Sequence, residues 1–150
     1  MKKEMTIYSP LQMMELGEAI GQQLQKNNII ALEGDLGAGK TTLTKGIAKG
    51  LGIGGVINSP TFTIMKIYDG PIKLYHMDVY RIEAVRDDFE LEEYFEDDGV
   101  CVIEWASRIR CILPQDILWM TLLDQGNDVR TVIMETCSTT YASIIEKVCL

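Results

Sequence analysis

The sequence predicts an α/β fold: a single domain with a mixed central β-sheet flanked by helices. Two segments, IIALE (29–33) and VCVIE (100–104), are apolar up to a terminal carboxylate, as in strands that are covered on both faces. Segments with helical periodicity alternate with the predicted strands, without a linker or an internal repeat. A length of 150 residues suits one hydrophobic core, so we expect residues 1–150 to form one domain.

The N-terminal part is predicted to form a strand at 5–8 and an amphipathic helix at 10–26. Ser9 suits the N-cap of this helix and Pro10 its first position. Gln12 completes a capping box with Ser9. The apolar face of the predicted helix consists of residues at helical spacing: Met13, Leu16, Ile20 and Leu24.

The remaining elements follow the strand at 29–33. A helix with Leu43, Ile47 and Leu51 on one face comes first. The segments 63–68 and 72–78 are predicted to form a hairpin around the Asp-Gly pair between them. Later elements are strands at 100–104, 116–123 and 130–136, and a closing helix marked by Tyr141, Ile144, Ile145 and Val148.

A glycine-rich turn, GDLGAGKTT (34–42), joins the strand at 29–33 to the helix after it. It matches the Walker A pattern G-x-x-x-x-G-K-[ST]. Glycines let backbone N–H groups approach phosphate oxygens, while Lys40 can reach the β- and γ-phosphates and the Thr41 hydroxyl can ligate Mg²⁺. The sequence therefore predicts a P-loop NTPase-like domain whose nucleotide-binding turn contains Gly34, Gly37, Ala38, Gly39, Lys40, Thr41 and Thr42.

A P-loop also requires a carboxylate at the end of a neighbouring strand to hold Mg²⁺ or its waters. Asp78 and Glu104 each end a predicted strand, and Glu104 has the more Walker-B-like surroundings. Thr61, in the loop SPTF, is a candidate switch residue that senses the γ-phosphate. Trp105 either packs against the nucleotide site or belongs to the core, and His76 either organises the site or is structural. No N/T-K-x-D guanine motif is present, which favours ATP.

Charge and cysteine content narrow the possible functions. The net charge is −8, and residues 83–98 carry nine carboxylates against one arginine, so direct RNA or DNA binding is disfavoured. This acidic segment is either a solvated helix face and loop or a docking surface for a basic partner. Four widely spaced cysteines and a single histidine argue against a zinc site. The N-terminus lacks the features of a signal peptide and no apolar run approaches about 18 residues, so we expect a cytoplasmic protein.

Four motifs occur in a fixed order: GDLGAGKTT, SPTF, LYHMDVYR and IEW. Together they closely resemble the TsaE (YjeE/YdiB) family of small bacterial P-loop ATPases. The resemblance implies a weak, Mg²⁺-dependent ATPase that supports formation of N6-threonylcarbamoyladenosine at position 37 of tRNA. It also implies that the protein acts on a complex of TsaD and TsaB, meets tRNA only through these partners, and is not the transferase.

The resemblance also implies roles for single residues. Lys40 and Thr41 match the Walker lysine and threonine, Thr61 the switch threonine, and Asp78 the aspartate of the D-x-Y-R motif. The family's glutamate–tryptophan pair matches the residues of the IEW motif, Glu104 and Trp105. Family members also close the nucleotide pocket with groups near the first helix and a late strand, for which Ser9 and Arg130 are the candidates here.

Two other functions share the P-loop. A small-molecule or nucleoside kinase would transfer the γ-phosphate to a hydroxyl, but it usually has a lid with several arginines, and only Arg81 and Arg86 follow Asp78 closely. A binding module would respond to ATP through a switch loop, with hydrolysis incidental.

Overall fold

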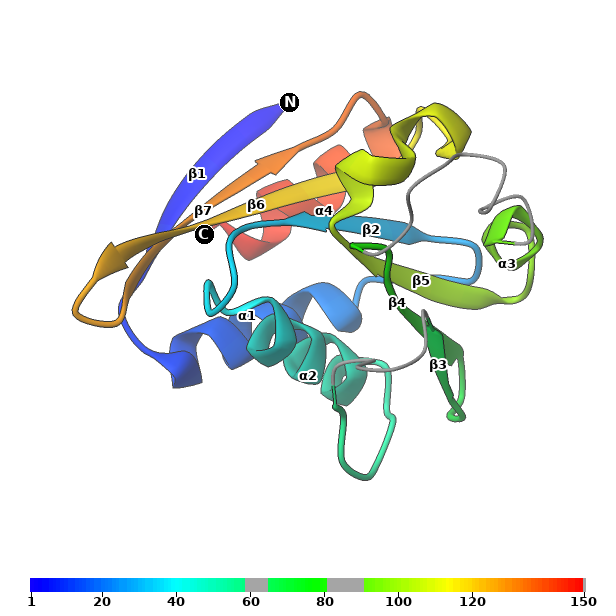
Figure 1. Cartoon of the computed structure of the whole chain (residues 1–150), viewed down its shortest axis with the longest axis horizontal. Coiled ribbons are helices and arrows are strands. Elements are labelled where there is room, and N and C mark those ends of the chain that lie inside the picture. Colours follow the sequence, from blue (N-terminus) through cyan, green and yellow to red (C-terminus); the bar gives the residue numbers. More distant parts are fainter. Residues whose placement is uncertain (59–64, 81–90, 150) are drawn as a thin grey trace.

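The computed structural model describes residues 1–58, 65–80 and 91–149, which form one seven-stranded sheet with helices on both faces (Figure 1). The strand order is β1-β7-β6-β2-β5-β4-β3. In chain order the elements are β1 (Lys2–Ile7), α1 (Pro10–Gly21), β2 (Ile29–Glu33), α2 (Lys40–Gly50), β3 (Met65–Tyr68), β4 (Lys73–Asp78), α3 (Glu92–Phe95), β5 (Gly99–Glu104), the 3₁₀ segment η2 (Ala106–Ile112), β6 (Leu118–Gly126), β7 (Val129–Glu135) and α4 (Thr139–Val148).

The centre of the sheet is parallel and its edges are antiparallel. Strand β2 pairs in parallel with β5 on one side and β6 on the other, and β5 pairs in parallel with β4. The pairs β1–β7, β6–β7 and β3–β4 are antiparallel. The predicted mixed sheet is therefore confirmed. The carboxyl ends of β2, β4 and β5 meet at one edge of the sheet, which is where open α/β sheets bind their ligands.

An apolar layer lies on each face of the sheet. Helices α1, α2 and α4 cover one face, and α3 and η2 cover the other. The central strand β2 is buried from Ile29 to Leu32, and β5 is buried along its whole length, as the apolar runs predicted. In the parts of the chain that the structure describes, none of the helices has the length and apolar character needed to cross a membrane.

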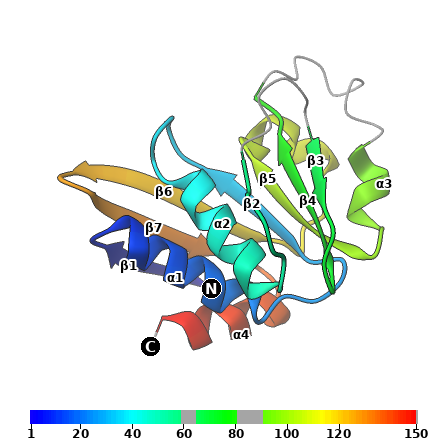
Figure 2. The ribbon, with the colours of Figure 1, turned by 90° about the horizontal axis from the view of Figure 1, so that it is seen from below.

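Helices α1 and α2 lie side by side with their backbones in direct contact (Figure 2). A Cβ added at Gly46 of α2 would lie 2.2 Å from the carbonyl oxygen of Met14, and one added at Gly17 of α1 would lie 2.4 Å from that of Leu43. Gly21 and Gly50 show the same close approach one turn further along, at 2.3 Å each. This contact fixes α2, and with it the glycine turn, relative to the start of α1.

The hairpin of β3 and β4 is confirmed, whereas several predicted boundaries were wrong. Helix α1 ends at Gly21, not at residue 26; Leu24 is still buried, so its periodicity indicated burial and not helix. Strand β6 continues to Gly126, and Asn127 and Asp128, both with positive φ, make the tight two-residue turn into β7. The short helix α3 lies within the acidic segment 83–98, for which a solvated helix face was one interpretation, whereas η2 was not predicted.

Candidate functional site

The glycine turn connects β2 to α2 and leaves the start of the helix open. Gly39 occupies the N-cap position with φ 108°, and no side chain caps the helix. The first turn of α2 therefore presents backbone N–H groups and the positive end of its dipole, an arrangement that suits a phosphate group. Gly34 has φ 151°, and a Cβ there would lie 2.7 Å from the carbonyl oxygen of Leu122, so the turn fits closely against β6.

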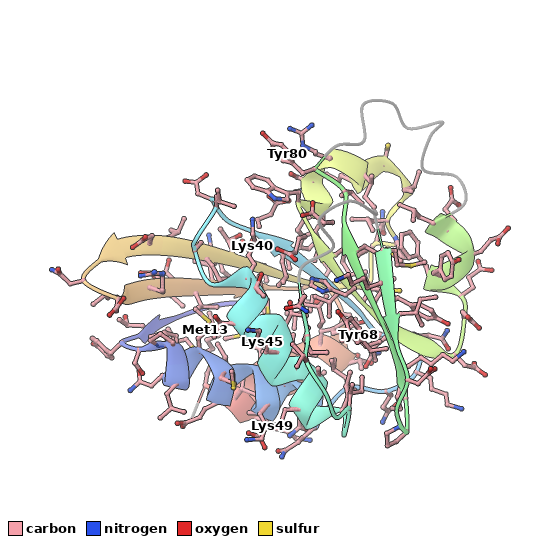
Figure 3. The ribbon with its side chains drawn as sticks, turned by 60° about the horizontal axis from the view of Figure 1, so that its bottom comes forward. Met13, Lys40, Lys45, Lys49, Tyr68 and Tyr80 are labelled. Atoms are coloured by element: carbon pink, nitrogen blue, oxygen red, sulfur yellow. The ribbon has the colours of Figure 1, made fainter. Side chains whose placement is uncertain are left out.

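Lys40, the first residue of α2, points back into the turn (Figure 3). Its side chain is buried, its Nζ donates a hydrogen bond to the carbonyl oxygen of Gly34, and the same atom lies 3.7 Å from the ring centre of Trp105. Burial lowers the pKa of Lys40, and the negative charges of Glu104 and Asp78 partly offset that effect. A cation enclosed in this way can neutralise an anion bound in the turn.

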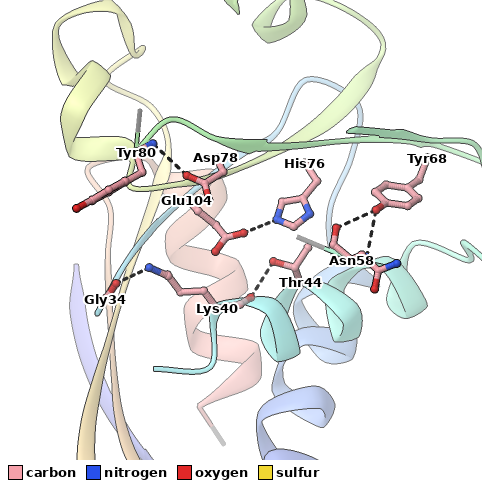
Figure 4. A network of polar contacts seen from close by, with 9 residues as sticks. All are labelled: Gly34, Lys40, Thr44, Asn58, Tyr68, His76, Asp78, Tyr80 and Glu104. Carbon is pink, nitrogen blue, oxygen red and sulfur yellow. Dashed lines mark hydrogen bonds and ion pairs between the residues drawn. The ribbon is translucent and has the colours of Figure 1, made fainter. Parts of the chain in front are cut away.

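Asp78 and Glu104 lie next to each other at the ends of β4 and β5, where their Cα atoms are paired in the parallel register. Figure 4 shows the two carboxyl groups beside Lys40. Oδ1 of Asp78 accepts a hydrogen bond from the backbone N–H of Tyr80 at 3.0 Å. Oε2 of the buried Glu104 lies 2.6 Å from Nε2 of His76. Each carboxylate thus has one oxygen held by a neighbour.

The donor atoms at this site suit Mg²⁺. Within the described ranges no group of three or more His, Cys, Asp or Glu residues could hold a metal ion. The carboxylates of Asp78 and Glu104, at adjacent strand ends, and the hydroxyl of Thr41, in the first turn of α2, stay the predicted ligands. These are hard oxygen donors. Mg²⁺ commonly takes one or two carboxylates, keeps several waters and completes its shell with phosphate oxygens.

A pocket of about 110 Å³ lies between the glycine turn, the start of α1 and the β6–β7 hairpin. Ser9 and Arg130 both line it. The Ser9 hydroxyl caps α1 by accepting a hydrogen bond from the backbone of Gln12 at 3.1 Å. Arg130 donates from Nε to the carbonyl oxygen of Ala38 at 3.2 Å and pairs with Asp124 at 3.0 Å. The other lining residues are Pro10, Met13, Gly37, Gly39, Thr42 and Asp128.

The structure brings most of the predicted site residues to one end of the sheet. Lys40, Asp78, Glu104 and Trp105 form one group, while Ser9 and Arg130 flank the glycine turn. Thr61, Arg81 and Arg86 lie outside the described residues, as does the acidic segment up to residue 90. The roles of all these residues in binding or catalysis stay predictions.

Sequence reasoning missed several residues around this group. The ring of Tyr80 lies 4.9 Å from that of Trp105, and the guanidinium of Arg108 lies 4.5 Å from the Tyr80 ring. Glu33, at the end of β2, accepts a hydrogen bond from the backbone of Ser107. Tyr80 stands two residues after Asp78, in the motif already singled out, so its position could have been a signal. Glu33 ends an apolar segment just as Glu104 does, so it carried the same signal, whereas Arg108 carried none.

Comparisons with known proteins found related sequences that cover most of the chain. A sequence model of the family described as "Threonylcarbamoyl adenosine biosynthesis protein TsaE" matches residues 7–132. The tRNA threonylcarbamoyladenosine biosynthesis protein TsaE of Bacillus subtilis is 50% identical over 121 residues, which cover 80% of this chain and 77% of that protein. The protein of the same name from Treponema pallidum is 43% identical over 120 residues, covering 77% and 89% of the two chains.

Similarity extends to a solved structure. The crystal structure of Bacillus subtilis YdiB superposes with a TM-score of 0.86 at 37% identity, covering 99% of this chain and 95% of that one. The matched region of the family model contains the glycine turn, both strand-end carboxylates and Arg130. On the strength of this match and of relatives that are up to half identical, the chain belongs to the TsaE family.

Proposed function

We propose that this protein binds ATP with Mg²⁺ at the glycine turn, hydrolyses it slowly, and thereby supports the formation of N6-threonylcarbamoyladenosine in tRNA. One observation carries the proposal: Asp78 and Glu104 stand in register at the ends of two parallel strands, beside the buried Lys40. The role in tRNA modification is supported by the relatives, which are named as tRNA threonylcarbamoyladenosine biosynthesis proteins. In this proposal residues 1–150 act as a single ATPase domain.

The phosphates of ATP bind to the first turn of α2. Backbone N–H groups from Gly37 to Thr42 surround them, and Lys40 leaves the carbonyl of Gly34 to contact the β- and γ-phosphates. Ser9 and Arg130, which line the neighbouring pocket, contact the nucleoside part. Thr41, Asp78 and Glu104 would hold Mg²⁺ directly or through its waters, and the metal would supply positive charge that neutralises the phosphates.

Hydrolysis depends on positioning more than on a strong base, because phosphoryl transfer relies mostly on alignment and charge stabilisation. Glu104 and Asp78 orient the attacking water, Lys40 stabilises the charge on the transferred group, and Trp105 borders the site at 3.7 Å from Lys40. Thr61 is the proposed switch that responds to the γ-phosphate. The product is ADP and phosphate, with no transfer to another acceptor.

The partners of the proposed cycle are TsaD and TsaB, and tRNA is met only through them. The net charge of −8 supports this, because a chain without a basic stripe does not gain the counterion release on which direct nucleic-acid binding depends. The proposed compartment is the cytoplasm, where tRNA is modified.

Two measurements test the proposal. Calorimetry with MgATP should show binding to the wild-type protein, and Lys40→Ala should weaken it by about tenfold to a hundredfold, the range expected for a lost charge-assisted hydrogen bond. Lys45→Ala, which removes an exposed lysine from the same helix (Figure 3), should bind ATP like the wild type. If the wild type shows no binding heat, or if Lys40→Ala binds ATP with unchanged affinity, the proposed ATP site at the glycine turn is wrong.

The biological role needs reconstitution. Purified TsaB, TsaD, an unmodified tRNA and the substrates of the reaction should give many turnovers of modified tRNA with this protein and few without it. Thr41→Ala should mainly reduce the rate of Mg²⁺-dependent ATP hydrolysis. Equal turnover with and without the protein would contradict the proposed role, even if ATP binds.

A further inference from the structure

His76, the single histidine of the chain, is fully buried and contacts a residue of the site. Its Nε2 lies 2.6 Å from Oε2 of Glu104 (Figure 4). It stands two residues before Asp78 on β4, so both side chains face the same side of the sheet, toward α2. The imidazole therefore lies on the same face of the sheet as the two carboxylates and contacts Glu104.

The surroundings of the ring make a polar side chain costly there. Leu74, two residues earlier on the same face of β4, and Val102, which pairs with His76 across the sheet, are both fully buried. Among the described residues Nδ1 of His76 has no hydrogen-bond partner. An unsatisfied buried polar atom costs about 1–3 kcal/mol, and a leucine or phenylalanine would avoid that cost. What the imidazole supplies in exchange is its contact with Glu104.

The two carboxylates of the site are held in different ways. Asp78 needs no side-chain partner for Oδ1, because the backbone of Tyr80 donates to it. Glu104 has no such backbone donor among the hydrogen bonds of the described residues, and His76 is the neighbour that contacts its Oε2. Without the ring, the longer glutamate side chain would have several rotamers open to it.

We propose that His76 is a positioning residue: its Nε2–H donates to Oε2 of Glu104 and orients the carboxylate so that Oε1 serves the metal and water of the site. This inference rests on the proposed function. Partners that orient a metal-binding or catalytic group in this way typically contribute 10–100-fold in metal affinity or activity.

The first test is spectroscopic and uses the unmodified protein without nucleotide. Because the chain has one histidine, ¹⁵N-edited NMR of its imidazole needs no assignment, once any purification tag has been removed. The proposal expects a proton on Nε2 with a downfield shift typical of a charge-assisted bond, moving upfield in Glu104→Gln. An Nε2 without a proton, or a signal that Glu104→Gln leaves in place, would overturn the proposal.

The second test compares two substitutions at His76. His76→Phe keeps the ring volume but cannot donate, and should reduce kcat, or the affinity for Mg²⁺ measured by calorimetry with ADP, by about 10–100-fold. His76→Gln keeps an N–H donor and should recover a large part of that loss. Tyr75→Phe is the matched control, because it removes a hydrogen bond from the opposite face of the same strand and should leave both quantities unchanged.

Failure of this inference is distinguishable from failure of the proposed function. If the wild type binds and hydrolyses MgATP but His76→Phe behaves like Tyr75→Phe, His76 is only a core residue. His76 is likewise only a core residue if His76→Phe lowers the stability of the protein without changing turnover, and if His76→Gln has the same turnover as His76→Phe. A wild type that binds no MgATP would instead contradict the proposed function, while the NMR result would still decide whether His76 donates to Glu104.

Discussion

The indole ring of Trp105 lies over the ammonium group of Lys40, with Nζ 3.7 Å from the ring centre. The ring is held in turn by Tyr80, at 4.9 Å, and by a backbone hydrogen bond from Trp105 to Leu32 at 3.0 Å. Trp105 also has φ 61°, a left-handed conformation that is uncommon for an aromatic residue. Backbone strain of this kind is concentrated at functional sites, and here it places the indole against the lysine of the glycine turn.

A triphosphate that recruits Lys40 must draw it away from this ring. We therefore expect MgATP to change the fluorescence of Trp105, because the cation next to the indole moves. Trp119 is the second tryptophan of the chain, so the measurement uses a Trp119→Phe background that retains Trp105 alone.

The control for this fluorescence change is Lys45→Ala in the same background, which should leave it intact since Lys45 is exposed on the surface of α2. Emission that stays constant while calorimetry shows the site to be saturated would mean that Lys40 does not move relative to the indole.

The contact between α1 and α2 predicts an unusual sensitivity to a single methyl group. In Gly46→Ala the new Cβ would lie 2.2 Å from the backbone oxygen of Met14, which no rotamer change can relieve. Overpacking of this kind costs about 1–3 kcal/mol, more than the gain of up to about 1 kcal/mol that alanine gives to a helix. We expect a net loss of free energy of unfolding, seen as a lower urea midpoint with an unchanged m-value.

The matched control is Gly54→Ala, because a Cβ at Gly54 has no atom within 4 Å. Its free energy of unfolding should stay within about 0.5 kcal/mol of the wild type, with almost the same urea midpoint. Since α1 carries Ser9 at its start and α2 carries Lys40, Gly46→Ala should also weaken ATP binding. Equal midpoints for the two variants would show that the helices can separate without loss.

The pH dependence of stability has a predictable contribution from Tyr75. Its hydroxyl donates to Asp97, and this hydrogen bond, together with burial, raises the pKa of Tyr75 to about 12. A pKa raised in the folded state stabilises the protein below the ordinary value of about 10, and the contribution is lost as the pH rises through 12. The same bond lowers the pKa of Asp97, whose contribution is lost in acid as that carboxylate is protonated.

Tyr75→Phe tests this directly. The free energy of unfolding of the wild type should exceed that of the variant by a constant amount between about pH 6 and 9, and the difference should shrink toward pH 12. Chemical denaturation at several pH values measures it. A difference that persists unchanged at pH 12 would show that the hydroxyl does not act through its proton.

Much of the fold was predictable because strands that are buried on both faces consist of consecutive apolar residues, a pattern that the sequence shows directly. The apolar runs of β2 and β5 predicted two central strands. Glu104, the carboxylate that ends β5, indicated the edge of the sheet where the site lies. The glycine turn could be recognised because each of its three glycines has a positive φ, such as 108° at Gly39, that other residues rarely adopt.

The rest depends on contacts between distant residues, which no local pattern encodes. The approach of Gly17 to Gly46 could not be read from glycines that sit inside two ordinary helical periods. The contact of His76 with Glu104 spans 28 residues and forms only because β4 and β5 pair in one particular register. The end of α1 was misplaced because Leu24 is buried although it lies beyond the helix. Burial alone does not distinguish a helical residue from a buried residue in the loop that follows.

The two strand-end carboxylates separate an ATPase from a module that only senses ATP. Asp78→Asn and Glu104→Gln keep the shape of each side chain but remove a charge next to Lys40. If hydrolysis drives the cycle, both variants should still bind ATP, within about tenfold of the wild type, because the phosphate-binding amides and Lys40 remain. Turnover should fall by about a hundredfold or more, as expected when an electrostatic contact to the reacting group is lost. Support of tRNA modification by TsaB and TsaD should fall with it.

Full modification by a variant that binds ATP but does not hydrolyse it would favour the sensing module, because nucleotide binding alone would then shift the state that the partners recognise.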